Sequence, residues 1–378
     1  MTALSLACLL ISHGYVLAPH PYSDATAGLI VPVQKSLPPD PVSPEWDTYF
    51  RDLQENRGFS GVVLIADQGK VVHTGAYGYA NLSQKDTLTL DAPFQLASVS
   101  KMFTAAAVML LKEAGKIDYD SHVKAYLPDF PYDSITVRHL LNHRSGLCRY
   151  MALSDEHWDK SQYLQNEDVL RLYQEHQPEL WFKPGTKFNY SNSNYALLAL
   201  IVERQTGLPF EVFLERNIFD PLCMTHTWTA RKRITGQLPG ETTGYKRYRR
   251  GYREEGRDYL DGVLGDKGVY STVKDLFLFD QALNNKEFLR PETLAEAAAP
   301  GSPELISHNY GFGWRMKTRQ EGLFYHFGWW RGFRACFFRD TTHQKTVIVL
   351  SNRDHLSNTP DYWEIYFRTL DGQEEPML

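Results

Sequence analysis

The stretch QLASVSKMFT, residues 95–104, continues into AAAVMLL, residues 105–111. This run is apolar on nearly every side, which is typical of a helix buried in a protein core. Its first turn nevertheless carries two hydroxyl groups and an ammonium, from Ser98, Ser100 and Lys101. A buried ammonium requires a reason, and catalysis is the commonest good one. We therefore expect the head of this helix to be a reactive site.

The spacing of Ser98 and Lys101 predicts a nucleophile and its base. A serine hydroxyl is a poor nucleophile until a base takes its proton. On a helix, residues three apart face the same way, about 5–6 Å apart between Cβ atoms. Burial favours the neutral amine of a lysine, which can then accept a proton near neutral pH. A helix N-terminus also favours developing negative charge at Ser98.

The Ser-x-x-Lys pattern occurs three times, so the pattern alone is weak evidence. The other matches pair Ser121 with Lys124 and Ser271 with Lys274. Lys124 follows an acidic stretch, and Lys274 opens an amphipathic helix, so both ammonium groups can reach water. We expect a buried lysine only at Lys101, which heads a helix that is apolar all round.

A second segment, FNYSNSN at residues 188–194, follows a turn and precedes a predicted helix. The phenol of Tyr190 can relay a proton beside an ammonium, and the amide of Asn192 can orient a substrate carbonyl. Taken alone, the segment is better explained as a turn followed by a helix cap. Its proximity to the serine is therefore the point that the structure must decide.

A third segment, YHFGWWRGF at residues 325–333, runs a predicted strand into Gly328. A glycine within a strand allows a ligand to approach the backbone closely. The N–H of Trp329 could pair with that of Ser98 as an oxyanion hole. An aromatic strand with a glycine bend is an equally good explanation of this segment in isolation.

Together the three segments resemble a known group of active-site motifs. Residues 98–101, 190–192 and 326–328 are similar to the three elements of the serine β-lactamase and penicillin-binding-protein superfamily. The Tyr-x-Asn form resembles its class C β-lactamase, DD-peptidase and esterase branch. The likeness extends over about residues 45 to 355, and all elements occur in the expected order.

The resemblance implies an α/β fold of the α+β type, with an antiparallel sheet flanked by helices and an inserted helical domain. Strand-like runs at both ends of the chain, with helical signals between them, favour the same architecture. We expect residues 40–95 and 305–378 to form the sheet domain and residues 96–304 a mostly helical domain. The active site is expected between the two domains.

The resemblance also implies roles for individual residues. Ser98 is expected to be acylated, while Lys101 and Tyr190 share the work of the general base. Asn192 is expected to position the substrate amide or ester. The strand that carries His326, Gly328 and Trp329 is expected to be an edge strand along which substrate docks. This acyl-enzyme chemistry requires no cofactor and no metal.

Several positions depart from the family pattern. His326 stands where β-lactamases and many DD-peptidases carry lysine, so less positive charge faces a substrate carboxylate. Trp329, Trp330 and Arg331 are bulkier than the residues usual after the glycine, although Arg331 could replace the missing charge. Cys223 stands where glycine is common. These departures disfavour efficient hydrolysis of β-lactams.

We therefore predict a serine hydrolase that acts on a small ester, an amide or a D-amino-acid peptide. The alternatives left open are a true β-lactamase or DD-carboxypeptidase, an acyltransferase, and a penicillin-binding sensor or scaffold with little turnover. The expected partner is a small-molecule or peptide substrate. The sequence leaves the natural substrate and the oligomeric state open.

The charge of the chain excludes other classes of partner. The 378 residues carry a formal net charge of −5. The one dense basic run, residues 246–250, is followed by Glu254 and Glu255, so we expect a solvated loop and no binding of nucleic acid. No apolar run reaches the ~18 residues of a membrane span.

Residues 1–27 resemble a secretory signal, with an apolar run at residues 3–11 and a small-residue site at Ala25-Thr26-Ala27. This pattern predicts export to the periplasm or the medium. The four cysteines have no metal-type or redox-type spacing, so free thiols are expected. His139 and His143 have the i, i+4 spacing of metal ligands. The resemblance gives their helix a packing role instead.

Overall fold

The computed structural model describes residues 40–231, 241–284, 288–305, 307–354 and 359–370. Its strands are β1 Gly61–Asp67, β2 Lys70–Tyr77, β3 Tyr79–Asn81, β4 Asp86–Thr87, β5 Phe94–Gln95, β6 Trp228–Thr229, β7 Tyr245–Tyr248, β8 Gly251–Glu254, β9 Val269–Ser271, β10 His308–Tyr310, β11 Arg315–Lys317, β12 Leu323–Trp330, β13 Phe333–Asp340, β14 Lys345–Ser351 and β15 Arg353–Asp354. Its α-helices are α1 Pro44–Arg57, α2 Lys101–Glu113, α3 Val137–Leu141, α4 Tyr150–His157, α5 Asn166–His176, α6 Asn192–Thr206, α7 Phe210–Leu214, α9 Val273–Asn284, α10 Pro291–Ala297 and α11 Thr359–Arg368. Shorter helical turns are η1 Ala97–Ser100, η2 Val123–Ala125, η3 Glu215–Phe219 and η4 Tyr259–Gly262.

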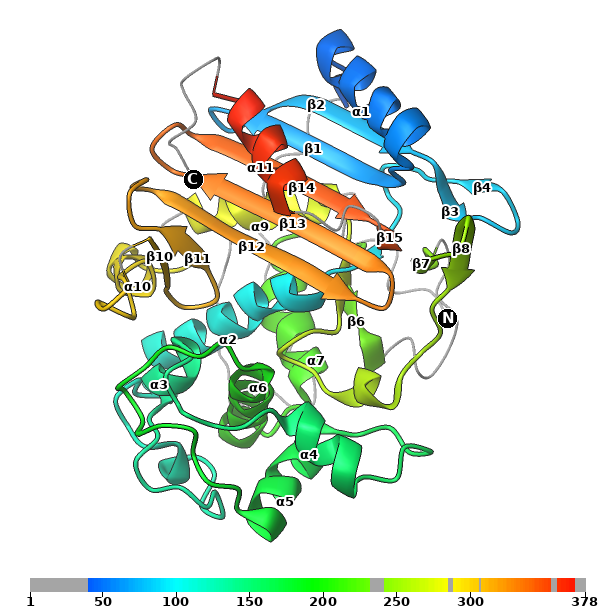
Figure 1. Ribbon diagram of the computed structural model, residues 1–378. Coiled ribbons are helices and arrows are strands. Elements are labelled where there is room, and N and C mark those ends of the chain that lie inside the picture. Colours follow the sequence, from blue (N-terminus) through cyan, green and yellow to red (C-terminus); the bar gives the residue numbers. More distant parts are fainter. Residues whose placement is uncertain (1–39, 232–240, 285–287, 306, 355–358, 371–378) are drawn as a thin grey trace, which may run out of the picture.

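A seven-stranded antiparallel sheet forms the centre of the fold (Figure 1), in the order β10-β11-β12-β13-β14-β1-β2. β1 pairs with β14 along its whole length, from Gly61 opposite Ser351 to Asp67 opposite Lys345. Strands from the two ends of the sequence therefore complete one sheet. The predicted α/β fold, with its sheet and flanking helices, is confirmed.

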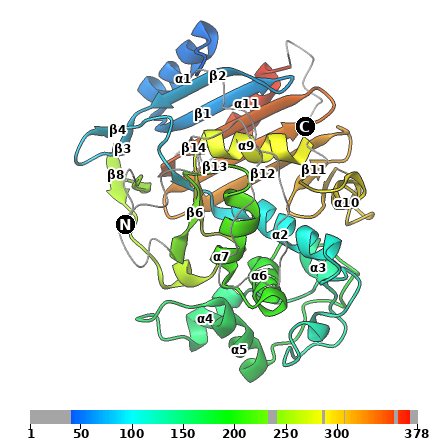
Figure 2. The same cartoon turned by 180° about the vertical axis from the view of Figure 1, so that it is seen from behind.

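Both faces of the sheet are covered, which explains why β1 is apolar from Gly61 to Ala66. Val63 and Ile65 face a cluster that includes α1 and α11. Val62 and Leu64 face the larger core that includes α2 and α9. Figure 1 shows α1 and α11 on one face of the sheet, and Figure 2 shows α9 on the other.

Helix α2 lies between the sheet and the helices α3 to α6 (Figure 1). All of its residues from Lys101 to Leu111 are buried, as the apolar sequence predicts. The helix ends where Gly115 adopts a φ of 69°, in the left-handed region that glycine enters without strain. A buried helix thus carries the reactive residues at its N-terminal end.

Residues 310–316, whose sequence suggests one continuous strand, are divided between two strands. The chain forms two short strands there, β10 and β11, joined by a tight turn. Gly313 in this turn has a φ of 82°, and a Cβ at this position would lie 2.9 Å from the Cβ of Ala105. The turn is therefore fixed by its packing against α2, a contact that local sequence does not reveal.

Within the described ranges, no disulfide links Cys148, Cys223 or Cys336, in agreement with the prediction. No helix in the described ranges combines the length and hydropathy needed to cross a bilayer. The predicted signal at residues 1–27, including Cys8, lies outside the described residues. The division into a sheet domain and a helical domain stays a prediction.

Candidate active site

The amine of Lys101 is fully buried and contacts Ser98. Its Nζ atom donates hydrogen bonds to Ser98 Oγ at 3.1 Å, to Asn192 Oδ1 at 2.8 Å and to the carbonyl oxygen of Asp266 at 2.6 Å. These three oxygens hold the amine in a fixed position beside Ser98. The structure therefore brings together Ser98, Lys101 and Asn192, although Lys101 and Asn192 are 91 residues apart in the sequence.

The other two Ser-x-x-Lys matches have no such geometry. Lys124 pairs with Asp133 at 2.6 Å on the surface. Lys274 pairs with Asp40 at 3.0 Å and with Asp91 at 3.3 Å. Lys101 therefore differs from both of these lysines in the burial of its amine, as the sequence predicts.

A short 3-10 turn, η1, presents Ser98 at the N-terminal side of α2. Ala97 adopts a φ of 49°, a conformation that residues with a Cβ rarely take. Its N–H donates to the buried Oε1 of Gln95 at 2.7 Å, which helps to hold this turn. The second hydroxyl of the motif, from Ser100, accepts a hydrogen bond from the N–H of Val269 at 3.0 Å. Ser100 therefore ties the turn to β9.

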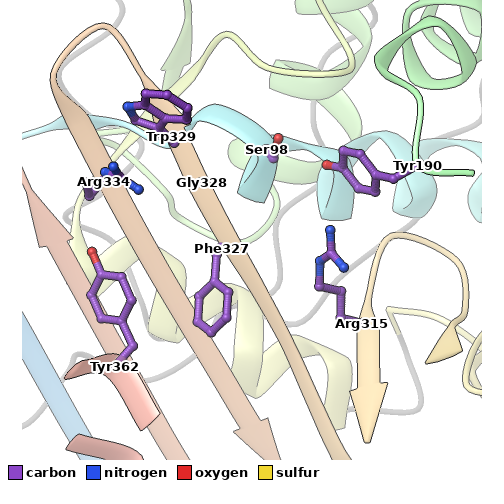
Figure 3. Close-up of a pocket in the computed structure, with 8 residues that line it drawn as sticks. All are labelled: Ser98, Tyr190, Arg315, Phe327, Gly328, Trp329, Arg334 and Tyr362. Carbon is purple, nitrogen blue, oxygen red and sulfur yellow. The ribbon is translucent and has the colours of Figure 1, made fainter. Parts of the chain in front are cut away.

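Tyr190 lies beside the same pair. Lys101 Nζ is 5.0 Å from the centre of the Tyr190 ring. Figure 3 shows the Tyr190 hydroxyl pointing toward Ser98, and this buried hydroxyl has no hydrogen-bond partner within the described ranges. The other side of the ring packs on His143, with ring centres 4.3 Å apart. The phenol is thus held beside Ser98 and Lys101, with a buried hydroxyl that makes no hydrogen bond within the described residues.

The two histidines with metal-ligand spacing have structural partners. Nδ1 of His139 accepts a hydrogen bond from the N–H of Thr136 at 3.2 Å, at the start of α3. Nδ1 of His143 accepts one from the N–H of Ser191 at 3.2 Å. His143 therefore supports the segment that carries Tyr190.

Strand β12 is not the outermost strand of the sheet, so the prediction of an edge strand needs correction. β11 pairs with β12 only at Tyr325 and Phe324. Beyond Tyr325, the side of β12 that faces away from β13 packs against η1 instead. A Cβ on Gly328 would lie 2.1 Å from the carbonyl oxygen of Leu96. Glycine is therefore required for the close approach of β12 to the turn that holds Ser98.

A pocket of about 200 Å³ opens beside Ser98. Trp329, whose side chain is 59% exposed, contributes to its rim. Figure 3 shows the lining side chains, which come from η1, β11, β12, β13, α11 and the segment before α6: Ser98, Tyr190, Arg315, Phe327, Gly328, Trp329, Arg334 and Tyr362. The predicted residues Gly328 and Trp329 belong to this wall.

His326 does not lie on the wall of the pocket, contrary to expectation. It is buried, and its Nε2 shares a hydrogen bond with the Tyr310 hydroxyl at 3.0 Å. Burial, with the positive charges of Arg315 and Lys101, holds the pKa of His326 well below its usual value. His326 is therefore neutral at neutral pH and supplies no cation to a substrate carboxylate.

Arg331 does not supply that cation either. It lies in the turn between β12 and β13, where it forms an ion pair with Asp258 and a second with Glu255 at 3.6 Å. Its φ of 46° belongs to the tight turn that joins the two strands. The expectation that Arg331 replaces the missing charge in the cleft is wrong.

Arg315 is the cation that the sequence did not reveal. Its guanidinium lies 4.8 Å from the centre of the Tyr190 ring and lines the pocket. No carboxylate in the described parts of the chain forms an ion pair with Arg315. Arg334, the other arginine of the wall, is paired with Asp354 at 2.9 Å. An arginine on a strand carries no local signal of function, because surface strands commonly contain one.

Comparison with known proteins agrees with this geometry. A family model described as Beta-lactamase matches residues 46–367. The chain is 34% identical to penicillin-binding protein 4* of Bacillus subtilis over 81% of this chain and 71% of that protein. It is 30% identical to a D-aminopeptidase of Cereibacter sphaeroides over 79% of this chain but only 57% of that longer protein.

The fold is also similar to a solved structure. The crystal structure of a penicillin-binding protein from Bacillus halodurans superimposes with a TM-score of 0.72 and 26% sequence identity. The match covers 80% of this chain and 94% of that one. From the extent of the family match and the identity to its members, we conclude that this chain belongs to the β-lactamase family.

Proposed function

We propose that this protein is a serine hydrolase that acts through an acyl-enzyme on a small ester, an amide or a D-amino-acid peptide. The observation that carries the proposal is the fully buried amine of Lys101, 3.1 Å from the hydroxyl oxygen of Ser98. Membership of a family whose relatives include penicillin-binding proteins and D-aminopeptidases supports it.

In the proposed first step, the Ser98 hydroxyl attacks the substrate carbonyl carbon and its proton passes to Lys101 or Tyr190. Asn192 positions the substrate amide or ester. The backbone N–H groups of Ser98 and Trp329 stabilise the oxyanion, as preorganised donors do in other acyl transfers. The leaving amine or alcohol takes the proton from the same base, and an ester of Ser98 remains.

In the second step, a water molecule attacks this ester and gives its proton to the same base. The tetrahedral intermediate then collapses, the Ser98 oxygen takes up the proton, and the acid product leaves. Both steps use only side chains and backbone groups of this chain. An alcohol or amine in place of water would yield transfer instead of hydrolysis.

The pocket favours a substrate that has both a carboxylate and an apolar group. Arg315 offers a guanidinium without a carboxylate partner in the described residues, and such a group can bind a carboxylate through two parallel hydrogen bonds. Phe327, Trp329 and Tyr362 supply an aromatic surface nearby. We propose that Arg315, rather than His326, meets the anionic end of the substrate.

The test is a panel of p-nitrophenyl esters, D-amino-acid amides, D-Ala-D-Ala peptides and nitrocefin, assayed side by side with the Ser98→Ala variant. We expect turnover of esters or amides that is lost in the variant, with slow or absent hydrolysis of nitrocefin. Efficient nitrocefin hydrolysis would identify a β-lactamase. Covalent labelling by penicillin without turnover would identify a sensor or scaffold.

We also propose that the active site lies between a sheet domain, residues 40–95 with 305–378, and a mostly helical domain, residues 96–304. The contact of β12 with η1, which carries Ser98, supports this place for the site. Export is proposed from the signal-like sequence at residues 1–27. Activity in the medium or periplasm of an expressing bacterium would test it.

A further inference from the structure

A second buried lysine lies next to the proposed catalytic group. Lys267 is only 3% exposed and lies just before β9. Its Nζ donates to the Tyr150 hydroxyl at 2.8 Å and lies 3.4 Å from Asp266 Oδ1. The Tyr150 hydroxyl in turn donates to Asp266 Oδ2 at 3.0 Å. These three residues, called here the buried triad, form a closed ring of polar contacts.

The buried triad adjoins Lys101 through the backbone. The carbonyl oxygen of Asp266 accepts the shortest of the three Lys101 hydrogen bonds, at 2.6 Å. The preceding carbonyl, of Gly265, accepts from Thr104 Oγ1 at 2.8 Å. Two successive carbonyls therefore bind two side chains from the first turn of α2. A small movement of this loop would move the acceptor that orients the Lys101 amine.

The buried triad also contacts the strand that carries the pocket wall. Lys267 Nζ lies 5.1 Å from the centre of the Trp330 ring, and Trp330 Nε1 donates to Asp261 at 2.7 Å. Trp330 follows Trp329, which lines the pocket. The same ammonium therefore contacts both the loop beneath Lys101 and the strand that carries the pocket wall.

Stability alone gives little reason to keep such a group. Taking two opposite charges out of water is costly, and apolar replacements of a buried ion pair are often neutral or stabilising. Burial lowers the pKa of Lys267, although the Asp266 carboxylate favours its ammonium form. Burial also raises the pKa of Tyr150. A role that depends on position is the simpler explanation.

We propose that Tyr150, Asp266 and Lys267 are positioning residues for Lys101. They fix the carbonyl oxygen of Asp266, and their balanced charges leave the surroundings of the Lys101 amine without a net charge from this side. The inference rests on the proposed function of Lys101 as a base. The buried triad is then a second set of polar and charged groups that acts on Lys101, and none of its members belongs to the three sequence motifs.

The variants of the buried triad described below leave the other charged and titratable groups around Lys101 unchanged. Tyr190 and Tyr195 place their rings 5.0 and 5.7 Å from Lys101 Nζ. Further groups among the described residues that interact electrostatically with Lys101, Lys267 or Tyr150 include His143, His326, Asp261 and Tyr259. Both histidines are held neutral by burial, so they add no charge near neutral pH.

The variants have opposite electrostatic consequences. Lys267→Met leaves the Asp266 carboxylate without its ammonium, and this lone anion favours the protonated form of the nearby amine. The acid limb of the pH profile, which is the low-pH side where the rate of Ser98 labelling rises, is therefore expected to move to higher pH by on the order of one pH unit. Asp266→Asn removes that carboxylate and keeps the Lys267 ammonium, so it produces no upward shift. The double variant, Lys267→Met with Asp266→Asn, removes both charges. Its acid limb is expected to lie within a few tenths of a pH unit of the wild-type limb.

The experiment measures the second-order rate of labelling by a fluorophosphonate from pH 5 to 10, because this rate needs only a nucleophilic Ser98. Circular dichroism at each pH confirms that the variants are folded. Lys267→Arg is the conservative variant, because it retains the cation; it is expected to keep the wild-type limb. Tyr150→Phe is expected to lower the rate about 3- to 10-fold without moving the limb, as a neutral hydrogen bond is lost.

An upward shift in Lys267→Met that the double variant reverses would support the inference. Superimposable profiles for a folded Lys267→Met and the wild type would overturn it while leaving the proposed function intact. If Lys267→Met does not fold, the comparison of Lys267→Arg with the double variant decides, and a shift in the double variant alone would overturn the charge-balance argument. Absence of Ser98 labelling in the wild type would overturn the proposed function itself, and this inference with it.

Discussion

The substitution Gly328→Ala tests how closely β12 must approach the turn that carries Ser98. The new Cβ would lie 2.1 Å from the Leu96 carbonyl oxygen and 3.2 Å from the Ala97 Cβ. Gly328 has no left-handed φ, so its backbone conformation is open to alanine and the effect is purely steric. Restoring an ordinary contact of 3.4 Å to that oxygen requires a displacement of about 1.3 Å.

Displacement on this scale separates the N–H of Trp329 from the carbonyl that Ser98 attacks. A misplacement of about 1 Å can reduce the rate about 100-fold, which corresponds to about 2.7 kcal/mol of transition-state stabilisation. We therefore expect kcat/KM for a p-nitrophenyl ester to fall about 100-fold. Overpacking of this kind also lowers the free energy of unfolding by about 1–3 kcal/mol.

The assay is steady-state ester hydrolysis, with the free energy of unfolding measured separately in urea. Gly251→Ala is the matched control, because a Cβ on this exposed strand glycine meets nothing within 4 Å. It should leave both quantities unchanged. A folded Gly328→Ala protein with kcat/KM within threefold of the wild type would refute the reasoning.

Three further predictions follow from single side chains. Lys101→Met removes the proposed base, so turnover of a p-nitrophenyl ester should fall between about 10²- and 10⁴-fold; a folded variant with undiminished kcat would contradict this role. Arg315→Met should raise KM about tenfold or more for a D-peptide with a free carboxylate, but not for its amide, and Arg331→Met should change neither; equal effects on both peptides would exclude a carboxylate contact. Burial lowers the pKa of His73 from 6.5 to about 4, so between these values the unfolded state binds one more proton and stability falls as the pH falls. In urea unfolding at several pH values, His73→Phe should flatten this slope by close to one proton, and an unchanged slope would show that His73 does not titrate in this way.

The nucleophile and its base could be predicted from the sequence because they lie on one helical turn. Their spacing, and the apolar residues that follow, specify both the contact and the burial of Lys101. The strands β1 and β14 were predictable for a similar reason, since each is built on a short apolar run. Features that depend on local spacing are therefore recovered well.

Features that depend on distant contacts were not recovered. Lys101 and its acceptor on Asp266 are 165 residues apart, and nothing near Lys267 marks it as buried. Arg331 is close to Gly328 in sequence, which suggested a place in the cleft. The tight turn at Arg331 and Gly332 instead directs that side chain to Asp258. Arg315 reaches the pocket only because β11 pairs with the start of β12.

The most direct measurement of the central claim is acid-quenched intact mass spectrometry during turnover of a p-nitrophenyl ester, followed by peptide mapping. We predict the transient gain of one acyl group, located on Ser98, with none in Ser98→Ala and much slower accumulation in Lys101→Met. An acyl group on another residue, or acylation of Ser98 at the wild-type rate without the Lys101 amine, would contradict the account.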